Sequence, residues 1–178
     1  FLREYSDLLK SHHVARLDEM LWRGAHANAR HMLNLVSEDQ QKLARARMAL
    51  RNRANNANSL LRQIPEDLLD DPGLNQARFE WRVRAGNWDD AKALLAARSA
   101  RAALLGQPEA WANRRRALAR DELRDGDANF AYQLASQHHL SRGSSYADLE
   151  WLSGYIALTK LDDPATALTH FEKHDQAV

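Results

Sequence analysis

The 178-residue sequence predicts an all-α fold, a tetratricopeptide-like solenoid built from pairs of helices. First, Ala, Leu and Arg are the three commonest residues, and all three are strong helix formers. Second, apolar residues recur at spacings of three and four, as at Trp151, Tyr155 and Leu158, the period of an amphipathic helix. The third observation is a weak internal repeat.

Each unit of this repeat has a turn residue, an Ala five positions later, and a helix-face residue four positions after that. The five turn residues are 28, 34, 40 and 36 residues apart, and such spacings are typical of helix-pair solenoids. We expect two antiparallel helices per unit, held close by the small Ala. The alternative is an irregular helical bundle with evenly spaced turns. The five units are Gly24/Ala29/Leu33, Asn52/Ala57/Leu61, Gly86/Ala91/Leu95, Gly126/Ala131/Ala135 and Asp162/Ala167/Phe171.

The last unit resembles a tetratricopeptide unit most clearly. Trp151 precedes Ala167 by sixteen residues, and Phe171 completes an Ala-x3-Phe pattern. The Gly of that consensus falls on Tyr155 here, so the match is partial.

Helix boundaries are also marked in the sequence. Ser37-Glu38-Asp39-Gln40 predicts a capping box, and Asp71-Pro72 and Asp163-Pro164 each place a capping Asp before a Pro at the first helical position. Ser144-Ser145 is interpreted as the cap of the Trp151 helix. Three glycines are predicted to end helices: Gly24, Gly86 and Gly126.

Length and charge exclude several classes of protein. Residues 1–178 are predicted to form a single domain, with two very small domains as the alternative. The 25 basic and 24 acidic residues nearly balance, which argues against a dedicated nucleic-acid binder. The absence of cysteine excludes disulfide scaffolds and Cys-ligated metal sites. No apolar run approaches a membrane span. Phe1–Tyr5 is not a signal peptide, and because no Met precedes it, we expect a piece of a longer chain.

Histidines are the obvious candidate metal ligands, but their spacing is unconvincing. His170 and His174 would share one helix face, yet Phe171 stands where a zincin has Glu, and no third ligand is implied. We therefore interpret the pair as a solvated helix end rather than as a metal site. His12-His13 and His138-His139 are interpreted as polar positions between helices. No metal or cofactor is therefore predicted.

Catalytic motifs are missing as well. There is no Gly-x-Ser-x-Gly and no phosphate-binding Gly loop. The paired acids Asp70-Asp71, Asp89-Asp90 and Asp162-Asp163 lie before or within the first turn of a predicted helix, where the helix dipole favours them. No catalytic residue is predicted, and substrate-binding residues are unknown.

Arginine supplies 20 of the 25 basic residues. Two clusters could follow an RNA backbone along a superhelix: Arg45, Arg47, Arg51 and Arg53, and Arg114, Arg115, Arg116 and Arg120. We favour charged helix faces paired with acids, such as Arg120 and Arg124 beside Asp121 and Glu122, and expect no nucleic-acid partner. The five tryptophans are expected to fill gaps between helices rather than to stack on sugars or bases: Trp22, Trp81, Trp88, Trp111 and Trp151.

A further feature of the chain is a series of short segments in a fixed order: Arg16-Leu17-Asp18, Leu21-Trp22, Ala29–Leu33, Pro108–Trp111, Arg114-Arg115, Leu118–Arg120, Gly126-Asp127, Ala131–Ala135, His138, Leu140, Glu150–Leu158, Asp163-Pro164 and His170-Phe171. This series resembles the soluble lytic murein transglycosylases of Gram-negative bacteria. The resemblance covers nearly the whole chain, and its specificity comes from the order of the segments.

The resemblance implies a superhelix of helix pairs that precedes a lysozyme-like catalytic domain. Such enzymes cleave the bond between N-acetylmuramic acid and N-acetylglucosamine in peptidoglycan and leave a 1,6-anhydro sugar. Their catalytic Glu is followed by Ser, with Gly-Leu-Met-Gln further on. None of the nine Glu residues here precedes Ser, and Gly-Leu-Met is absent, so no catalytic residue carries over.

We therefore expect a periplasmic, non-catalytic scaffold segment that orients the absent C-terminal catalytic domain and glycan strands of the parent lyase. The main alternative is a free-standing tetratricopeptide-like adaptor that binds a protein partner in its groove. An RNA-binding helical repeat is a third, weaker alternative.

Overall fold

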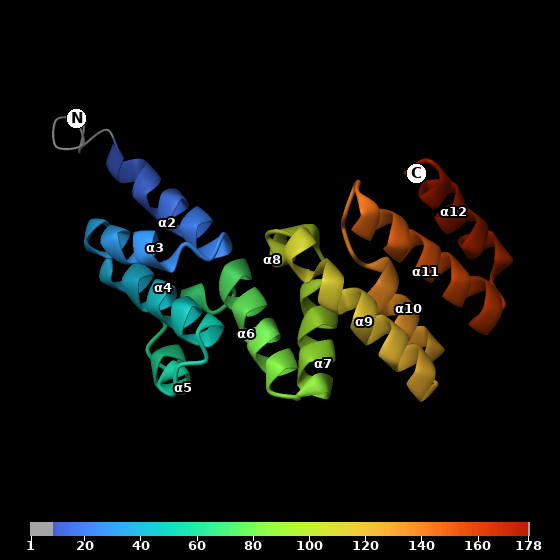
Figure 1. The fold of residues 1–178 in the computed structure, drawn as a ribbon, viewed down its shortest axis with the longest axis horizontal. Helices are drawn as coiled ribbons and strands as arrows, with labels where there is room; N and C mark the ends of the chain where they lie inside the picture. Colours follow the sequence, from blue (N-terminus) through green and yellow to red (C-terminus); the bar gives the residue numbers. More distant parts are fainter. Residues whose placement is uncertain (1–8, 178) are drawn as a thin grey trace. The chain divides into compact units, whose positions relative to one another are not determined.

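The computed structural model describes residues 9–177 of the chain, and every regular element in that part is helical (Figure 1). The prediction of an all-α fold is confirmed. Phe1–Tyr5 lies outside the described residues. The elements are η1 (Lys10–His12), α2 (His13–Trp22), α3 (His26–Met32), η2 (Leu33–Leu35), α4 (Glu38–Arg51), α5 (Ala57–Leu61), η3 (Glu66–Leu68), α6 (Pro72–Arg84), α7 (Trp88–Arg98), α8 (Ala102–Leu105), α9 (Glu109–Asp125), α10 (Ala128–Ser136), α11 (Ser144–Lys160) and α12 (Pro164–Asp175).

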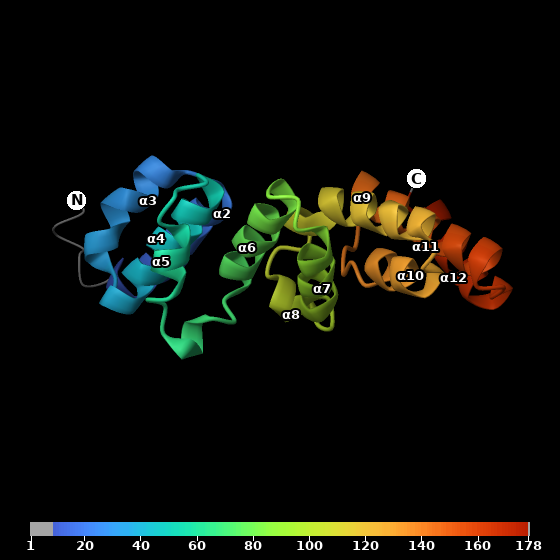
Figure 2. The same cartoon turned by 90° about the horizontal axis from the view of Figure 1, so that it is seen from below.

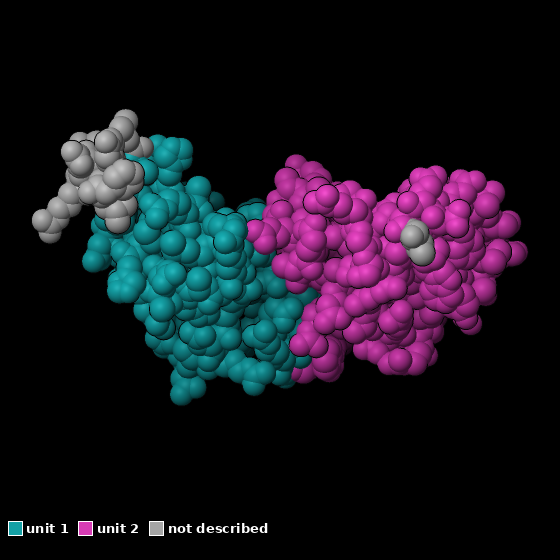
Figure 3. All heavy atoms as spheres, turned by 45° about the horizontal axis from the view of Figure 1, so that its top comes forward, with its two compact units in different colours: residues 1–85 teal, residues 86–178 magenta. Residues whose placement is uncertain are grey.

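The chain divides into two compact units, residues 1–85 and 86–178, coloured separately in Figure 3. Each unit is described by itself. Both the single domain and the continuous solenoid therefore stay predictions.

Unit 1 is organised around α4, which is buried on two faces. Leu43, Ala46 and Leu50 pack toward α5 and α6 in one apolar cluster. Ala44 and Met48 belong to a second cluster, with α2 and α3. Because its apolar residues point in two directions, α4 packs between two layers of helices.

Unit 2 contains two consecutive helix pairs, α9 with α10 and α11 with α12, which lie side by side in Figures 1 and 2. Helix α10 also packs against α11 and joins the two pairs. Trp111, Leu118, Leu134, Leu149 and Ile156 are almost completely buried between these helices. This apolar core holds the polar side chains of the unit in fixed positions.

The five alanines of the predicted repeat are all buried, each at most 3% exposed, and they lie on α3, α5, α7, α10 and α12. Four of the five turn residues have positive φ, namely Gly24, Gly86, Gly126 and Asp162. In the remaining unit, the positive φ falls on Arg53, one residue after Asn52. The repeat thus marks turns that lead into closely packed helices.

The predicted helix boundaries largely agree with the structure. The Ser37, Asp71 and Asp163 side chains each accept a backbone N–H at the start of a helix. Gly126 closes α9 in the left-handed region. The Ser144 prediction was wrong, because Gly143 occupies the capping position of α11 and no side chain caps that helix.

Gly154 brings α11 and α12 into close contact. A Cβ atom added to Gly154 would lie 2.7 Å from the Phe171 ring. The tetratricopeptide consensus places a glycine at position 155, which is Tyr155 here. The glycine that the close contact between α11 and α12 requires is instead Gly154, one position earlier.

Across residues 9–177, no helix combines the length and the apolar character needed to cross a membrane.

Candidate functional site

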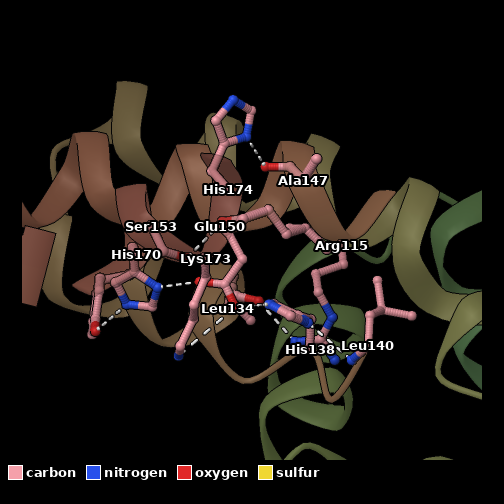
Figure 4. Close-up of polar contacts among 12 residues, drawn as sticks. Arg115, Leu134, His138, Leu140, Ala147, Glu150, Ser153, His170, Lys173 and His174 are labelled. Atoms are coloured by element: carbon pink, nitrogen blue, oxygen red, sulfur yellow. Dashed lines mark hydrogen bonds and ion pairs between the residues drawn. The ribbon is translucent and has the colours of Figure 1, made fainter. Parts of the chain in front are cut away.

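The densest buried polar cluster of unit 2 surrounds the carboxylate of Glu150 on α11 (Figure 4). Its Oε1 lies 3.2 Å from His138 Nε2, and its Oε2 lies 2.5 Å from His170 Nδ1. Lys173 Nζ is 4.0 Å from Oε1. Glu150 is only 3% exposed, so its charge is balanced by these neighbours rather than by water.

His138 is fixed in one tautomer by the loop that follows α10. The Leu140 N–H donates to His138 Nδ1 at 2.9 Å, so that nitrogen carries no proton. The proton of the neutral ring is therefore on Nε2, from which it is donated to Glu150. Tyr146 packs edge-on against the ring, with centroids 5.6 Å apart. His138 thus ties the loop to α11 through both of its ring nitrogens.

His170 extends the cluster to α10. Its Nδ1 donates to Glu150, and its Nε2 lies 2.9 Å from the Tyr132 hydroxyl. Side-chain hydrogen bonds therefore link Tyr132 to His170, His170 to Glu150 and Glu150 to His138. This hydrogen-bonded series connects three helices and one loop. Each member comes from a different place in the sequence, which is why no spacing motif reveals the cluster.

Electrostatics keep Glu150 ionised and Tyr132 neutral. Burial on its own would raise the pKa of the Glu150 carboxyl, but the hydrogen bonds and the Coulombic interactions with His138 and His170 together lower that pKa to about 2. Burial raises the pKa of the Tyr132 hydroxyl, and the nearby carboxylates Asp163 and Glu150 add to this. Because its pKa is raised, the Tyr132 hydroxyl keeps its proton and is not available as a general base.

This arrangement suits a structural role better than catalysis. A general acid must present a protonated carboxyl near neutral pH, whereas the pKa of Glu150 is lowered to about 2. Both oxygens of Glu150 already accept hydrogen bonds. The cluster instead fixes the relative positions of α10, α11 and α12.

Arg115 on α9 is the second buried polar anchor of unit 2. It is fully buried, and it donates to the Leu134 carbonyl at 2.7 Å and to Ser99 Oγ at 2.6 Å. Burial lowers its pKa to about 10. The Ser99 carbonyl in turn accepts from His139 Nε2 at 2.7 Å, so α7, α9, α10 and the following loop meet at one point.

The predicted pairing of arginines with acids is confirmed for three of the arginines to which it applied, and Glu122 pairs with Lys92 rather than with an arginine. Arg47 pairs with Asp18 and Asp71, Arg116 with Asp148 and Arg124 with Asp121. Arg51 donates instead to the backbone carbonyls of Leu21 and Trp22. These side chains fasten helices together.

Three of the four histidines in the two adjacent pairs occupy the predicted polar positions between elements. His13 contacts the Leu35 carbonyl, and His138 and His139 contact Glu150 and Ser99, but the prediction was wrong for His12, which is exposed. The interpretation as a solvated helix end was wrong for His170, which is buried, and Nδ1 of His174 contacts the Ala147 carbonyl instead of converging with His170. No three His, Cys, Asp or Glu side chains within residues 9–177 are arranged to hold a metal ion.

The tryptophan prediction holds for only part of the set. Trp111 is fully buried and donates to the Leu105 carbonyl at 3.0 Å, and Trp22 and Trp81 are partly buried. The prediction was wrong for Trp88 and Trp151, which are 49% and 45% exposed. Trp88 begins α7 beside a turn, and Trp151 stacks on Tyr155 along an exposed face of α11, so neither has a helix packed over it.

Comparisons with protein-family models, with curated proteins and with solved structures gave no match.

Proposed function

We propose that this chain is a non-catalytic helical scaffold segment of a periplasmic peptidoglycan lytic transglycosylase. In the parent enzyme it would orient a C-terminal catalytic domain toward the glycan strand. That domain would cleave between N-acetylmuramic acid and N-acetylglucosamine and form the 1,6-anhydro end.

The observation that carries the proposal is the helix-pair construction that recurs along the chain. Helices α2 with α3, α4 with α5, α9 with α10 and α11 with α12 pack as sequential neighbours. The ordered family-like segments fall on these pairs, from Arg16 in α2 to Phe171 in α12. A rigid scaffold contributes to catalysis by fixing the orientation of a substrate toward a remote acid.

The chemistry of the acids supports a non-catalytic role. The catalytic Glu of such enzymes precedes Ser, whereas the nine Glu residues here precede Tyr, Met, Asp, Asp, Trp, Ala, Leu, Trp and Lys. Glu150, the most buried of the described Glu residues, is ionised and doubly hydrogen-bonded.

The decisive experiment is the intact mass and full reading frame of the native protein. We expect a chain that extends well past Val178 and supplies Glu-Ser followed by Gly-Leu-Met-Gln. A native chain that ends near Val178 would overturn the proposal.

A second experiment tests the absence of catalysis directly. Purified sacculi incubated with this chain alone should release no 1,6-anhydro-muropeptides by mass spectrometry, whereas the native full-length protein should release them. Release by the chain alone contradicts the non-catalytic role.

A partner-binding adaptor is the second candidate, favoured by one exposed face of α11. The Trp151 and Tyr155 rings stack with centroids 5.4 Å apart and an interplanar angle of 11°. Leu158, one turn further along, is 46% exposed. Such an apolar stripe suits a protein partner, and a native chain that ends near Val178 would make this the working hypothesis.

A further inference from the structure

Unit 1 contains a cavity of about 400 Å³ that the scaffold proposal does not use. It lies between α2, α4 and the segment that leads into α6. Its walls are mainly aliphatic. The side chains that supply them are Val14, Leu17, Leu21, Leu43 and Leu68.

One end of the cavity is charged. Arg47 is 4% exposed, and its Nη1 lies 2.5 Å from Asp18 Oδ1 and 3.4 Å from Asp71 Oδ1. Its guanidinium also lies 5.5 Å from the centre of the Trp22 ring. A Cβ atom added to Gly73 would be 2.0 Å from Arg47 Nη2, so the missing side chain at Gly73 leaves room for the guanidinium.

The charges lining the cavity do not cancel. Among the lining residues that the structure describes, Asp18 and Asp71 carry two negative charges, Arg47 carries one positive charge, and the others are uncharged. This described lining therefore has a net charge of −1. Two carboxylates therefore share one guanidinium. Asp18, whose side chain is 44% exposed, accepts from Arg47 at 2.5 Å, whereas Asp71 is 3.4 Å from Arg47 and accepts the Leu74 N–H at 2.6 Å.

An apolar cavity with one uncompensated negative charge complements a ligand that has an alkyl body and a cationic end. An anionic ligand would be repelled by Asp18. A neutral apolar ligand would leave the carboxylate charge unbalanced. Burial raises the pKa of the Asp71 carboxyl although Arg47 opposes this, so a second cation close by would stabilise its ionised form.

We propose that this cavity binds an alkylammonium group, with the aliphatic walls around the alkyl chain and the carboxylate of Asp18 paired with the ammonium. The proposal is independent of the transglycosylase assignment, since it depends only on the lining of unit 1. The ligand is either a free amine or the side chain of a basic residue in a peptide.

The test compares three probes of equal chain length that differ in charge: hexylammonium, 1-hexanol and hexanoate. Amide chemical shifts of the intact chain are followed during each titration. Hexylammonium should bind saturably and shift the amides of Leu17, Leu43 and Leu68, at least tenfold more tightly than hexanol, and hexanoate should not bind. Equal affinity for hexylammonium and hexanol, or no saturable binding by folded protein, overturns the proposal.

Two variants and a control locate the site. Asp18→Asn should weaken hexylammonium binding at least tenfold, and Asp67→Asn, which removes an exposed carboxylate beside the cavity residue Leu68, should leave it unchanged. Because Asp18→Asn also removes a partner of Arg47, Ala15→Leu is the second variant. Ala15 is an exposed residue at the cavity, so this change narrows the cavity, keeps every charge and should also weaken binding.

The source of the ammonium is resolved by one more probe, the neutral-backbone compound Nα-acetyl-lysine methylamide. Binding of this compound with the same shifts indicates a basic peptide side chain. Binding of hexylammonium alone indicates a free amine. Unchanged hexylammonium affinity in both folded variants overturns the proposal.

Discussion

Glu150 and His170, twenty residues apart, are joined by a 2.5 Å hydrogen bond that ties α11 to α12. The bond is buried, since both side chains are less than 10% exposed. A buried carboxylate is tolerated only when hydrogen bonds replace its lost water, and His138 supplies the second one. The position of Glu150 therefore depends on two imidazoles from outside its own helix.

The first prediction concerns acid stability. The pKa of Glu150 is lowered from 4.5 to about 2, so its stabilisation is complete above about pH 4.5 and is lost as the pH falls through about 2. The shift corresponds to about 3 kcal/mol. Urea unfolding between pH 6 and pH 2 should show a loss of this size that is absent from Glu150→Gln, which is less stable at pH 6.

Glu172→Gln is the control for this experiment, because Glu172 is an exposed Glu on α12. Its unfolding free energy should follow that of the unchanged chain at every pH. Parallel pH curves for Glu150→Gln and the unchanged chain would contradict the role of Glu150.

The second prediction concerns the outer end of the same cluster. Tyr132→Phe removes the hydroxyl that lies 2.9 Å from His170 Nε2 and should cost about 1 kcal/mol in the free energy of unfolding. Tyr155→Phe is the control, since Tyr155 is 37% exposed and contacts Trp151 through its ring. Equal effects of the two changes would show that the Tyr132 hydroxyl adds nothing.

The elements of the fold were predictable from sequence because they depend on local chemistry. The repeat placed Ala29, Ala91 and Ala131 at helix contacts, and each is 0% exposed. The capping roles of Asp71 and Asp163 were likewise visible, since a capping side chain bonds only three residues ahead.

The buried clusters were not predictable, because their members are distant in sequence. Glu150 gave no local signal, His138 was predicted only as a polar position between helices, and His170 was considered only together with His174. The exposure of Trp88 was missed for a related reason, since only packing decides whether a large apolar residue is covered. The sequence showed a cluster of arginines between Arg45 and Arg53, but it could not show that Arg47 is the one whose side chain is buried.

The third prediction concerns the buried guanidinium of Arg115. Its Nη1 donates to the Leu134 carbonyl while its Nη2 donates to Ser99 Oγ. A lysine ammonium cannot reproduce this two-pronged geometry. Arg115→Lys should therefore cost about 2 kcal/mol, measured by urea unfolding. Arg120→Lys, at an exposed position on the same helix, should change stability by less than about 0.5 kcal/mol. A loss for Arg115→Lys no larger than this control would remove Arg115 as an anchor.

The fourth prediction concerns the contact between Gly154 and Phe171. A Cβ atom at Gly154 would lie 2.7 Å from the ring, so Gly154→Ala forces α11 and α12 apart or displaces the ring. Overpacking of this kind should cost about 1–3 kcal/mol, although alanine has the higher helix propensity.

The double variant Gly154→Ala with Phe171→Leu tests whether the contact itself is responsible. A smaller side chain at position 171 makes room for the added methyl, so the second change should recover part of the loss caused by the first. Thermal unfolding of the four proteins gives the coupling free energy between the two positions. Strictly additive effects would mean that Gly154 is not required by Phe171, and that α12 could pack on α11 with a larger side chain between them.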